Sequence, residues 1–168
     1  MTKQHTDIRR TLLILRRDDE VLLAMKKRGF GVGKWNGVGG KLEPGETVEQ
    51  ALLRECREEI DVVPMNYWLV AEHDFVQDAE TDDPWHMYVY AYICDEWERD
   101  PIETEEMRPE WFNIKDIPYA DMWQDDEYWL PQVLAGKKVV SKFTFDINDN
   151  LINHEVVVRE ILPSKASV

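Results

Sequence analysis

The stretch from Gly37 to Val62, GVGGKLEPGETVEQALLRECREEIDV, constrains this chain more than any other part of the sequence. In its second half, Thr47 and Gln50 have the spacing of an N-terminal capping box. Behind that box, apolar side chains recur every four residues, at Val48, Leu52, Cys56 and Ile60. This period is typical of an amphipathic helix with one buried face, so the pattern predicts a helix in this half of the stretch.

Three carboxylates, those of Glu55, Glu58 and Glu59, lie beside the apolar positions of the predicted helix. At 3.6 residues per turn they project within roughly 100° of one another, so they share one edge of the helix. Like charges at this spacing repel, and a hard divalent cation such as Mg²⁺ or Mn²⁺ would relieve the repulsion. The alternative is an ordinary solvated acidic face, since 34 of the 168 residues are acidic.

The loop in front of the helix favours a functional site over a solvated face. It is rich in turn-forming residues, namely Gly37, Gly39, Gly40, Pro44 and Gly45. Such loops let backbone N–H groups approach an anion closely, and here the loop leads directly into the helix. Loop and helix are therefore expected to form one binding site for a metal ion and a phosphorylated substrate.

These residues resemble the signature of the Nudix hydrolases. That signature is Gly, five residues, Glu, seven residues and Arg-Glu-hydrophobic-x-Glu-Glu-x-Gly-hydrophobic, and it is matched by Gly40, Glu46, Arg54, Glu55, Cys56, Glu58, Glu59 and Val62. Two positions depart from the usual pattern. Cys56 stands where an aliphatic residue is usual, which is a mild change because a buried cysteine behaves as a small hydrophobe. Asp61 stands where Gly would serve a left-handed helix cap, so the geometry of the helix exit is the point to check.

The resemblance implies a reaction in which water attacks a diphosphate bridge with the help of bound Mg²⁺, with Mn²⁺ as a substitute. It assigns the metal ligands to Gly39, Glu55, Glu58, Glu59 and Glu106. It assigns catalysis to Glu58, Glu59 and Glu106. Which carboxylate takes the proton of the water is left open, because carboxylates coupled around a metal do not divide cleanly into ligand and base.

Three further blocks resemble the members of this family that hydrolyse oxidised purine nucleoside triphosphates. They are MKKRGFGVGKWNGVGGKLEPGET, EEMRPEWFNIKDIPYADMWQDDEYWLP and KFTF, and the similarity covers about residues 10 to 159. It implies that substrate is bound by Thr11, Lys26, Asn36, Gly40, Lys41, Trp123, Asp125 and Asp126. Gln124 replaces the proline that is usual between the tryptophan and the aspartate pair, which leaves the course of that loop to be determined.

The adjacent Asp125 and Asp126 suit base recognition on physical grounds as well. In a half-buried pocket, desolvation and mutual repulsion raise the pKa of at least one carboxyl group, which leaves one donor and one acceptor. Such a pair can distinguish guanine oxidised at C8, whose N7 has become a donor. The alternative is that both residues cap the helix that follows. Trp123 also has two possible roles: it could provide a stacking surface for a purine, or it could be an ordinary residue of the hydrophobic core.

The function expected from these features is Mg²⁺-dependent hydrolysis of 8-oxo-dGTP and 2-hydroxy-dATP to monophosphate and pyrophosphate. One alternative is hydrolysis of another nucleoside diphosphate derivative, namely ADP-ribose, a dinucleoside polyphosphate or an unmodified triphosphate. The other is a nucleotide sensor without turnover. A pure binder would have no need of Arg54, Glu55, Glu58 and Glu59 together, which favours an enzyme.

Composition sets the outer limits of these expectations. A length of 168 residues fits a single domain, with an ordered core at about 7–161. The net charge of −14 argues against binding of duplex nucleic acid or an anionic membrane. The N-terminus lacks an apolar signal core, and no apolar run approaches the ~20 residues of a membrane span. Cys56 and Cys94 show no motif spacing, so reduced core thiols in a cytoplasmic protein are expected. The resemblance implies a monomer.

The order of patterns along the chain predicts an α+β fold. A hairpin is expected at 8–15 and 21–25, strands at 65–76, 85–94 and 110–114, and a final hairpin at 142–147 and 151–158. Residues 95–106 are expected to form an acidic loop, 125–135 a second helix kinked at Pro131, and the tail from Pro163 to be disordered. The resemblance implies the same arrangement, a mixed β-sheet packed between helices as an α/β/α sandwich.

Overall fold

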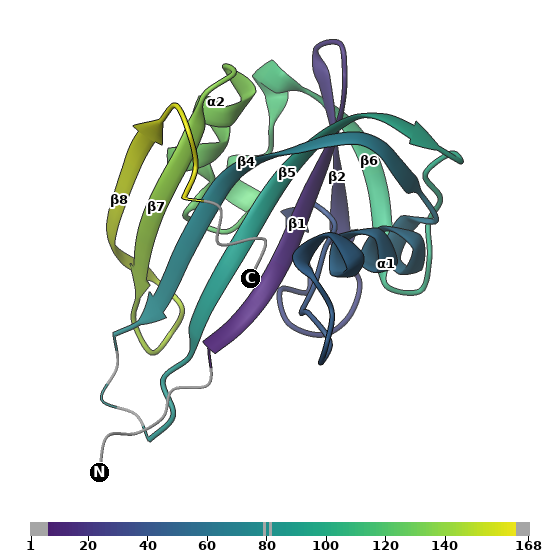
Figure 1. Cartoon of the computed structure of the whole chain (residues 1–168). Helices are drawn as coiled ribbons and strands as arrows, with labels where there is room; N and C mark the ends of the chain where they lie inside the picture. The colour runs from purple at the N-terminus through teal and green to yellow at the C-terminus, as the bar shows by residue number, and fades with distance from the viewer. Residues whose placement is uncertain (1–6, 79, 81, 164–168) are drawn as a thin grey trace.

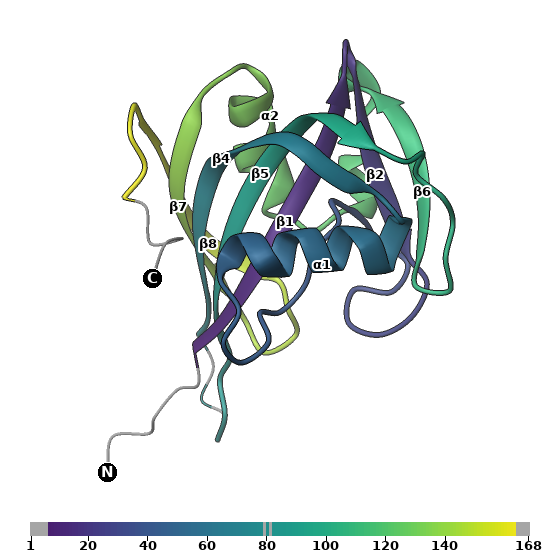
Figure 2. The same ribbon diagram turned by 45° about the vertical axis from the view of Figure 1, so that its right-hand side comes forward.

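The computed structural model describes residues 7–78, 80 and 82–163. Within this part of the chain, a mixed sheet of eight strands carries one α-helix on each face (Figures 1 and 2). The strands are β1 (Asp7–Arg17), β2 (Glu20–Lys26), β3 (Trp35–Asn36), β4 (Val63–Gln77), β5 (His86–Glu98), β6 (Met107–Asn113), β7 (Lys138–Phe145) and β8 (Leu151–Arg159). The helices are α1 (Val48–Ile60) and α2 (Asp126–Leu134). The predicted α+β class with a mixed sheet between helices is confirmed.

The sheet is ordered β3-β2-β1-β5-β4-β7-β8, and β6 pairs with β2 over its whole length, from Glu20 to Lys26. The pairs β1·β5 and β4·β7 are parallel, whereas the remaining neighbours are antiparallel. Because β1 runs beside β5 at the centre of the sheet, the start of the chain lies next to elements from its middle. Side chains from β1, β4 and β5 can therefore meet in one cavity.

Helix α1 begins as its sequence predicts. The Thr47 side chain accepts a hydrogen bond from the backbone N–H of Gln50, and the Gln50 side chain accepts one from that of Thr47. At the other end, Asp61 adopts the left-handed conformation, with φ 58° and ψ 37°. Its carboxylate contacts Arg99 at 2.6 Å and Arg57 at 3.4 Å. The position where the family pattern has Gly thus keeps the backbone geometry of a glycine cap.

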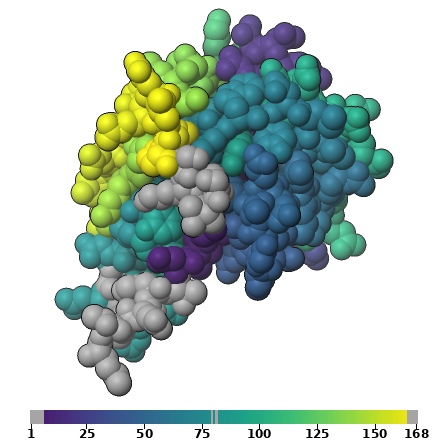
Figure 3. All heavy atoms as spheres, in the orientation of Figure 1, coloured from purple at the N-terminus to yellow at the C-terminus, as the bar shows by residue number. Residues whose placement is uncertain are grey.

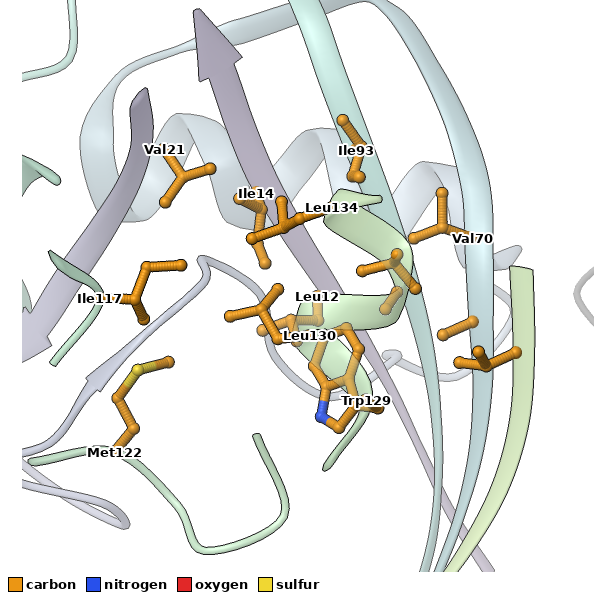
Figure 4. Packing of buried hydrophobic residues seen from close by; sticks show 14 of the residues in the cluster. Leu12, Ile14, Val21, Val70, Ile93, Ile117, Met122, Trp129, Leu130 and Leu134 are labelled. Carbon is orange, nitrogen blue, oxygen red and sulfur yellow. The ribbon is translucent and has the colours of Figure 1, made fainter. Parts of the chain in front are cut away.

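Two apolar clusters hold the helices against the sheet. Leu13, Leu15 and other side chains of one sheet face pack on the buried stripe of α1. Leu12 and Ile14 point to the opposite face, where they meet Trp129 from α2, and Figure 4 shows this second cluster. Alternate residues of β1 therefore serve different cores, as the period of a strand requires. In Figure 3, α1 lies on the surface of the first face and β8 forms the edge of the molecule.

Some boundaries differ from the sequence-based expectations. β5 continues to Glu98, into the segment expected to be a loop, because residues 94–98 pair with β4 and Trp97 stacks on Trp111 at 5.8 Å. Helix α2 runs through Pro131 without a break, held by the buried side chains of Trp129 and Leu130. β7 spans 138–145, earlier than expected, in register with β4. The expected disordered tail lies beyond the described residues, apart from Pro163.

No helix in the described part of the chain is both long enough and apolar enough to cross a lipid bilayer.

Candidate active site

The glycine-rich loop lies directly against the carboxylate edge of α1. The backbone N–H of Gly39 donates a hydrogen bond of 3.0 Å to Oε2 of Glu59. A Cβ on Gly39 would lie 1.9 Å from the carbonyl oxygen of Thr11, and a Cβ on Gly40 would lie 2.5 Å from Oε1 of Glu55. Gly39 is required by this close approach to backbone, whereas a larger residue at position 40 would push the Glu55 carboxylate out of its place.

A single guanidinium, that of Arg54, organises the carboxylates around it. Its Nε lies 2.6 Å from Glu46, and its Nη1 lies 2.9 Å from Glu55 and 3.2 Å from Glu58. Its Nη2 also donates to the backbone carbonyl of Lys41 at 3.0 Å. Arg54 therefore ties the loop to the helix and holds two of the predicted metal-binding carboxylates in place.

The carboxylate of Glu59 is almost completely buried, with 2% of the residue exposed. Burial, together with the neighbouring charges of Glu55 and Glu106, raises its pKa to about 8. Burial likewise raises the pKa of Glu55. A bound cation would stabilise the charged form of these adjacent carboxylates, and carboxylate oxygens are the ligands that a hard divalent ion prefers. The donor chemistry therefore fits Mg²⁺.

The predicted ligands do not converge as a metal-binding group in this structure. Within the described residues, no three Asp, Glu, His or Cys side chains are gathered closely enough to hold a metal ion. The reason is visible in the ion pairs, because Arg54 draws Glu55 and Glu58 toward itself while Arg28 lies 3.3 Å from Glu106. The electrostatic coupling of Glu55, Glu59 and Glu106 nevertheless places them in one neighbourhood.

A cavity adjoins this carboxylate edge and extends to the far side of the sheet, where α2 lies. Its empty volume is about 970 Å³, part of it open to solvent. The lining includes Thr11, Lys26, Asn36, Gly40, Trp123, Asp125 and Asp126, all of which were predicted from the sequence to bind substrate. Lys41 is the exception among those predictions, since it is exposed and does not line the cavity. Its observed contribution is the backbone contact with Arg54.

Four buried polar atoms in the described residues have no hydrogen-bond partner: Nε of Arg10, Oγ1 of Thr11, Nε2 of His73 and Oδ2 of Asp126. All four residues line this one cavity. Buried polar groups are nearly always satisfied in proteins, and each exception needs an explanation. A polar ligand with several donors and acceptors, bound in this cavity, would supply partners for such atoms.

The aspartate pair lies at the start of α2, with both residues at most 4% exposed. Oδ2 of Asp125 accepts a hydrogen bond of 3.1 Å from Nε1 of Trp129. Burial raises the pKa of Asp125 to about 6, and burial together with the Asp125 charge raises that of Asp126. Asp125 occupies the N-cap position, yet its side chain makes no capping hydrogen bond. For Asp125, capping therefore does not account for the buried carboxylate.

One aromatic part of the cavity wall is formed by Trp123 and Phe30, whose rings stack with centroids 5.0 Å apart and planes at 26°. Nζ of Lys34 lies 5.1 Å from the centre of the Trp123 ring. The loop that carries Trp123 is anchored by Gln124, whose Oε1 accepts a hydrogen bond of 2.8 Å from the backbone N–H of Leu151. Gln124 thus fixes the loop by a contact that a proline could not make.

The structure adds cavity residues that sequence reasoning missed, among them Arg10, Phe30, Lys34, His73 and Trp129. Arg10 had a detectable signal, because it is a cation on the same side of its strand as the apolar Leu12 and Ile14. His73 had none. Its position in the cavity depends on the pairing of β4 with β7, which periodicity within one strand does not reveal.

The NUDIX domain family model matches residues 6–133. Two curated proteins named oxidized purine nucleoside triphosphate hydrolase are similar over most of the chain. The Danio rerio protein is 41% identical over 146 residues and the Mus musculus protein 40% over 148 residues, each covering 87% of this chain and 92% of the relative. A solved structure of a MutT protein from Bacillus halodurans has a TM-score of 0.79 at 24% identity, covering 89% of this chain and 97% of its own.

Proposed function

The chain belongs to the NUDIX domain family, and from this premise we propose that it hydrolyses oxidised purine nucleoside triphosphates, 8-oxo-dGTP and 2-hydroxy-dATP, to monophosphate and pyrophosphate. The observation that carries the proposal is that four residues, each with an unpartnered buried polar atom, line one cavity beside the Nudix carboxylates. Two relatives about 40% identical, both named as hydrolases of such nucleotides, support the choice of substrate.

The base end of the substrate would enter between Trp123 and the aspartate pair. A purine has the area to stack on the Trp123 indole, which contributes about 1–3 kcal/mol per base. The raised pKa values of Asp125 and Asp126 leave a protonated carboxyl to donate and a carboxylate to accept. Oxidation of guanine at C8 turns N7 from an acceptor into a donor, so one edge of the base becomes complementary to the pair. Asn36 lines the same cavity and offers an amide to the base.

The phosphate end would lie toward Arg10, Lys26 and the carboxylate edge of α1. Gly39, Glu55, Glu58, Glu59 and Glu106 would hold Mg²⁺, and Mn²⁺ has similar ligand preferences. The bound ion supplies neutralisation of phosphate charge and orientation of the attacking water. Glu58, Glu59 and Glu106 are the candidates for the base that removes the proton of that water. Glu59 is already fixed by the Gly39 N–H, which suits a group that must keep one orientation.

One assay tests this function against its rivals. The protein is incubated with Mg²⁺ and, separately, with 8-oxo-dGTP, 2-hydroxy-dATP, dGTP, ATP and ADP-ribose, and the products are resolved. Fastest release of pyrophosphate from the oxidised nucleotides is the expected result. Preferred cleavage of ADP-ribose or of unmodified triphosphates would replace the proposed substrate class, and absence of any product would favour a nucleotide sensor.

We further propose that the chain forms one domain and acts as a monomer in the cytoplasm. The two cysteines are free and buried, which suits a compartment where thiols stay reduced. The acidic net charge of −14 argues against duplex nucleic acid or an anionic membrane as a partner. Gel filtration with light scattering tests the oligomeric state directly, and a mass of about two chains would contradict the monomer.

A further inference from the structure

A histidine lies in the wall of the proposed base cavity. His73 belongs to β4, and only 2% of the residue is exposed. Its ring packs among Trp129, Phe75 and Phe143, with a centroid distance of 4.4 Å to the nearest ring, that of Trp129. Three aromatic rings would pack equally well against a phenylalanine, so the imidazole is a polar group within a cluster of aromatic side chains.

The two ring nitrogens of His73 have different environments. Nδ1 is hydrogen-bonded to the hydroxyl of Ser141, on the paired strand β7. Nε2 is buried and has no partner within the described part of the chain, and His73 lines the cavity. Of the two nitrogens, Nε2 is thus the one that has no hydrogen-bond partner among the described residues.

Ser141 determines which nitrogen carries the proton. The residue is 4% exposed, and in the described part of the chain His73 is the only partner found for its hydroxyl. A buried hydroxyl hydrogen needs an acceptor, so the O–H of Ser141 donates to Nδ1, and the ring proton resides on Nε2. Burial lowers the pKa of His73 to about 3, which keeps the ring neutral at physiological pH. The cavity wall therefore presents a neutral N–H donor.

We propose that His73 is a specificity-determining residue whose Nε2–H donates a hydrogen bond to a carbonyl oxygen of the bound purine. Ser141 is its positioning residue, since it fixes the tautomer without lining the cavity. This inference rests on the proposed function, which places the base in this cavity. The Trp129 indole contacts both recognition groups, because it donates to Asp125 and packs on His73. The donor would extend recognition beyond the aspartate pair.

Binding of monophosphates tests the inference without requiring turnover. Affinities of 8-oxo-dGMP, 2-hydroxy-dAMP and dAMP are measured by calorimetry in EDTA for the wild type, His73→Phe and Ser141→Ala. The base of dAMP has no carbonyl oxygen, so it serves as the matched ligand. His73→Phe should weaken the two carbonyl-bearing ligands by about 3- to 10-fold, the usual worth of one hydrogen bond, and change dAMP by less than about 2-fold. Ser141→Ala should show a smaller loss with the same selectivity.

Two variants separate recognition from packing. His73→Asn keeps an N–H donor and should recover part of the selectivity that His73→Phe loses. His154→Phe alters a histidine that stacks on Tyr128 and does not line the cavity, and it should leave all three affinities unchanged. Thermal melting of each variant reports its folding, and Ser141→Ala decides the question if His73→Phe does not fold.

The possible outcomes distinguish this inference from the proposed function. Equal losses for all three ligands in His73→Phe would reduce His73 to a packing role, and unchanged affinities would remove it from recognition. A wild type that binds dAMP as well as the carbonyl-bearing ligands would also overturn the inference. If the wild type binds the oxidised monophosphates selectively but hydrolyses no triphosphate, the proposed function is contradicted and the inference about His73 is not.

Discussion

The backbone N–H of Gly39 donates a hydrogen bond of 3.0 Å to the carboxylate of Glu59, and this contact joins the glycine-rich loop to α1. The raised pKa of Glu59, about 8, shows that the buried site disfavours its charge without a cation. A glutamine at this position can still accept the hydrogen bond from Gly39, yet it supplies no negative charge. A glutamine at position 59 therefore tests the role of the negative charge while it keeps the contact that joins the loop to the helix.

Glu59→Gln should reduce kcat on 8-oxo-dGTP by about 10²–10⁴-fold, the usual contribution of a general base. Binding of 8-oxo-dGMP and the melting temperature should remain close to those of the wild type, since the contact with Gly39 is kept. Glu49→Gln is the matched control, because Glu49 lies exposed in the first turn of the same helix. Full activity of Glu59→Gln in a steady-state assay would exclude Glu59 from both metal binding and catalysis.

Removal of the divalent ion should abolish turnover and lower stability. A ligand that binds only the folded state at 100 times its Kd adds about 2.7 kcal/mol to the free energy of unfolding. Titration of the EDTA-treated protein with Mg²⁺ should therefore raise its melting temperature by several degrees. Glu55→Gln should weaken this response and Glu49→Gln should preserve it, as followed by differential scanning fluorimetry. An equal response in both variants would contradict the assignment of Glu55 as a ligand.

The aspartate pair should govern selectivity. Asp125→Asn and Asp126→Asn should each lower the preference for 8-oxo-dGTP over dGTP, measured as a ratio of kcat/KM, by at least about 10-fold, because an unpaired buried group costs about 1–3 kcal/mol. Glu127→Gln, an exposed neighbour on the same helix turn, is the control. An unchanged ratio in both aspartate variants would remove the recognition model.

The same pair should make stability depend on pH with a defined sign. Burial raises the folded-state pKa of Asp125 from 3.8 to about 6, so the folded protein binds a proton that the unfolded chain has released. The free energy of unfolding therefore falls as pH rises through this interval, by up to about 3 kcal/mol for a fully buried group. Asp125→Asn lacks the effect. In urea titrations, its stability relative to the wild type should be higher at pH 7.5 than at pH 4.5, and equal differences would contradict the raised pKa.

The carboxylate edge of α1 could be predicted from the sequence because its geometry is local. Glu55, Glu58 and Glu59 share an edge through helical period alone, and the capping box of Thr47 fixed where that helix begins. The role of His73 could not be predicted in this way. Ser141 is 68 residues away along the chain, and the two meet only because β4 and β7 pair in parallel. The periodicity of side chains along the sequence predicts single helices and strands. Which residues share a cavity wall depends on the order in which the strands pair, and that order is not visible in the periodicity.

Asp61 illustrates a second limit of pattern reading. The absence of the usual glycine suggests that the left-handed helix cap is lost. Asp61 nevertheless adopts the left-handed conformation, and its carboxylate lies 2.6 Å from Arg99. Asp61→Gly should therefore change the melting temperature little, because relief of the backbone offsets loss of the ion pairs. Asp61→Val should lower it by several degrees, because a β-branched residue strains this conformation. Asp61→Asn, which tolerates the backbone without the charge, is the control. A stable Val variant with normal melting would show that the cap has no role in stability.

Arg10 provides a last test, at the phosphate end of the cavity. Its Nε is buried without a partner, its guanidinium lies 5.7 Å from the Phe30 ring, and the charges of Glu55 and Glu59 act on it. A hydrogen bond to a charged group contributes about 1.5–3 kcal/mol, so Arg10→Met should raise the KM for 8-oxo-dGTP by about 10- to 100-fold. Arg9→Met is the matched control, because the Arg9 guanidinium lies over Tyr90, a residue of the α1-side cluster, and does not line the cavity. Binding of the uncharged nucleoside 8-oxo-deoxyguanosine should be unaffected in both variants, and a loss there equal to the loss for triphosphate would place Arg10 beside the base instead.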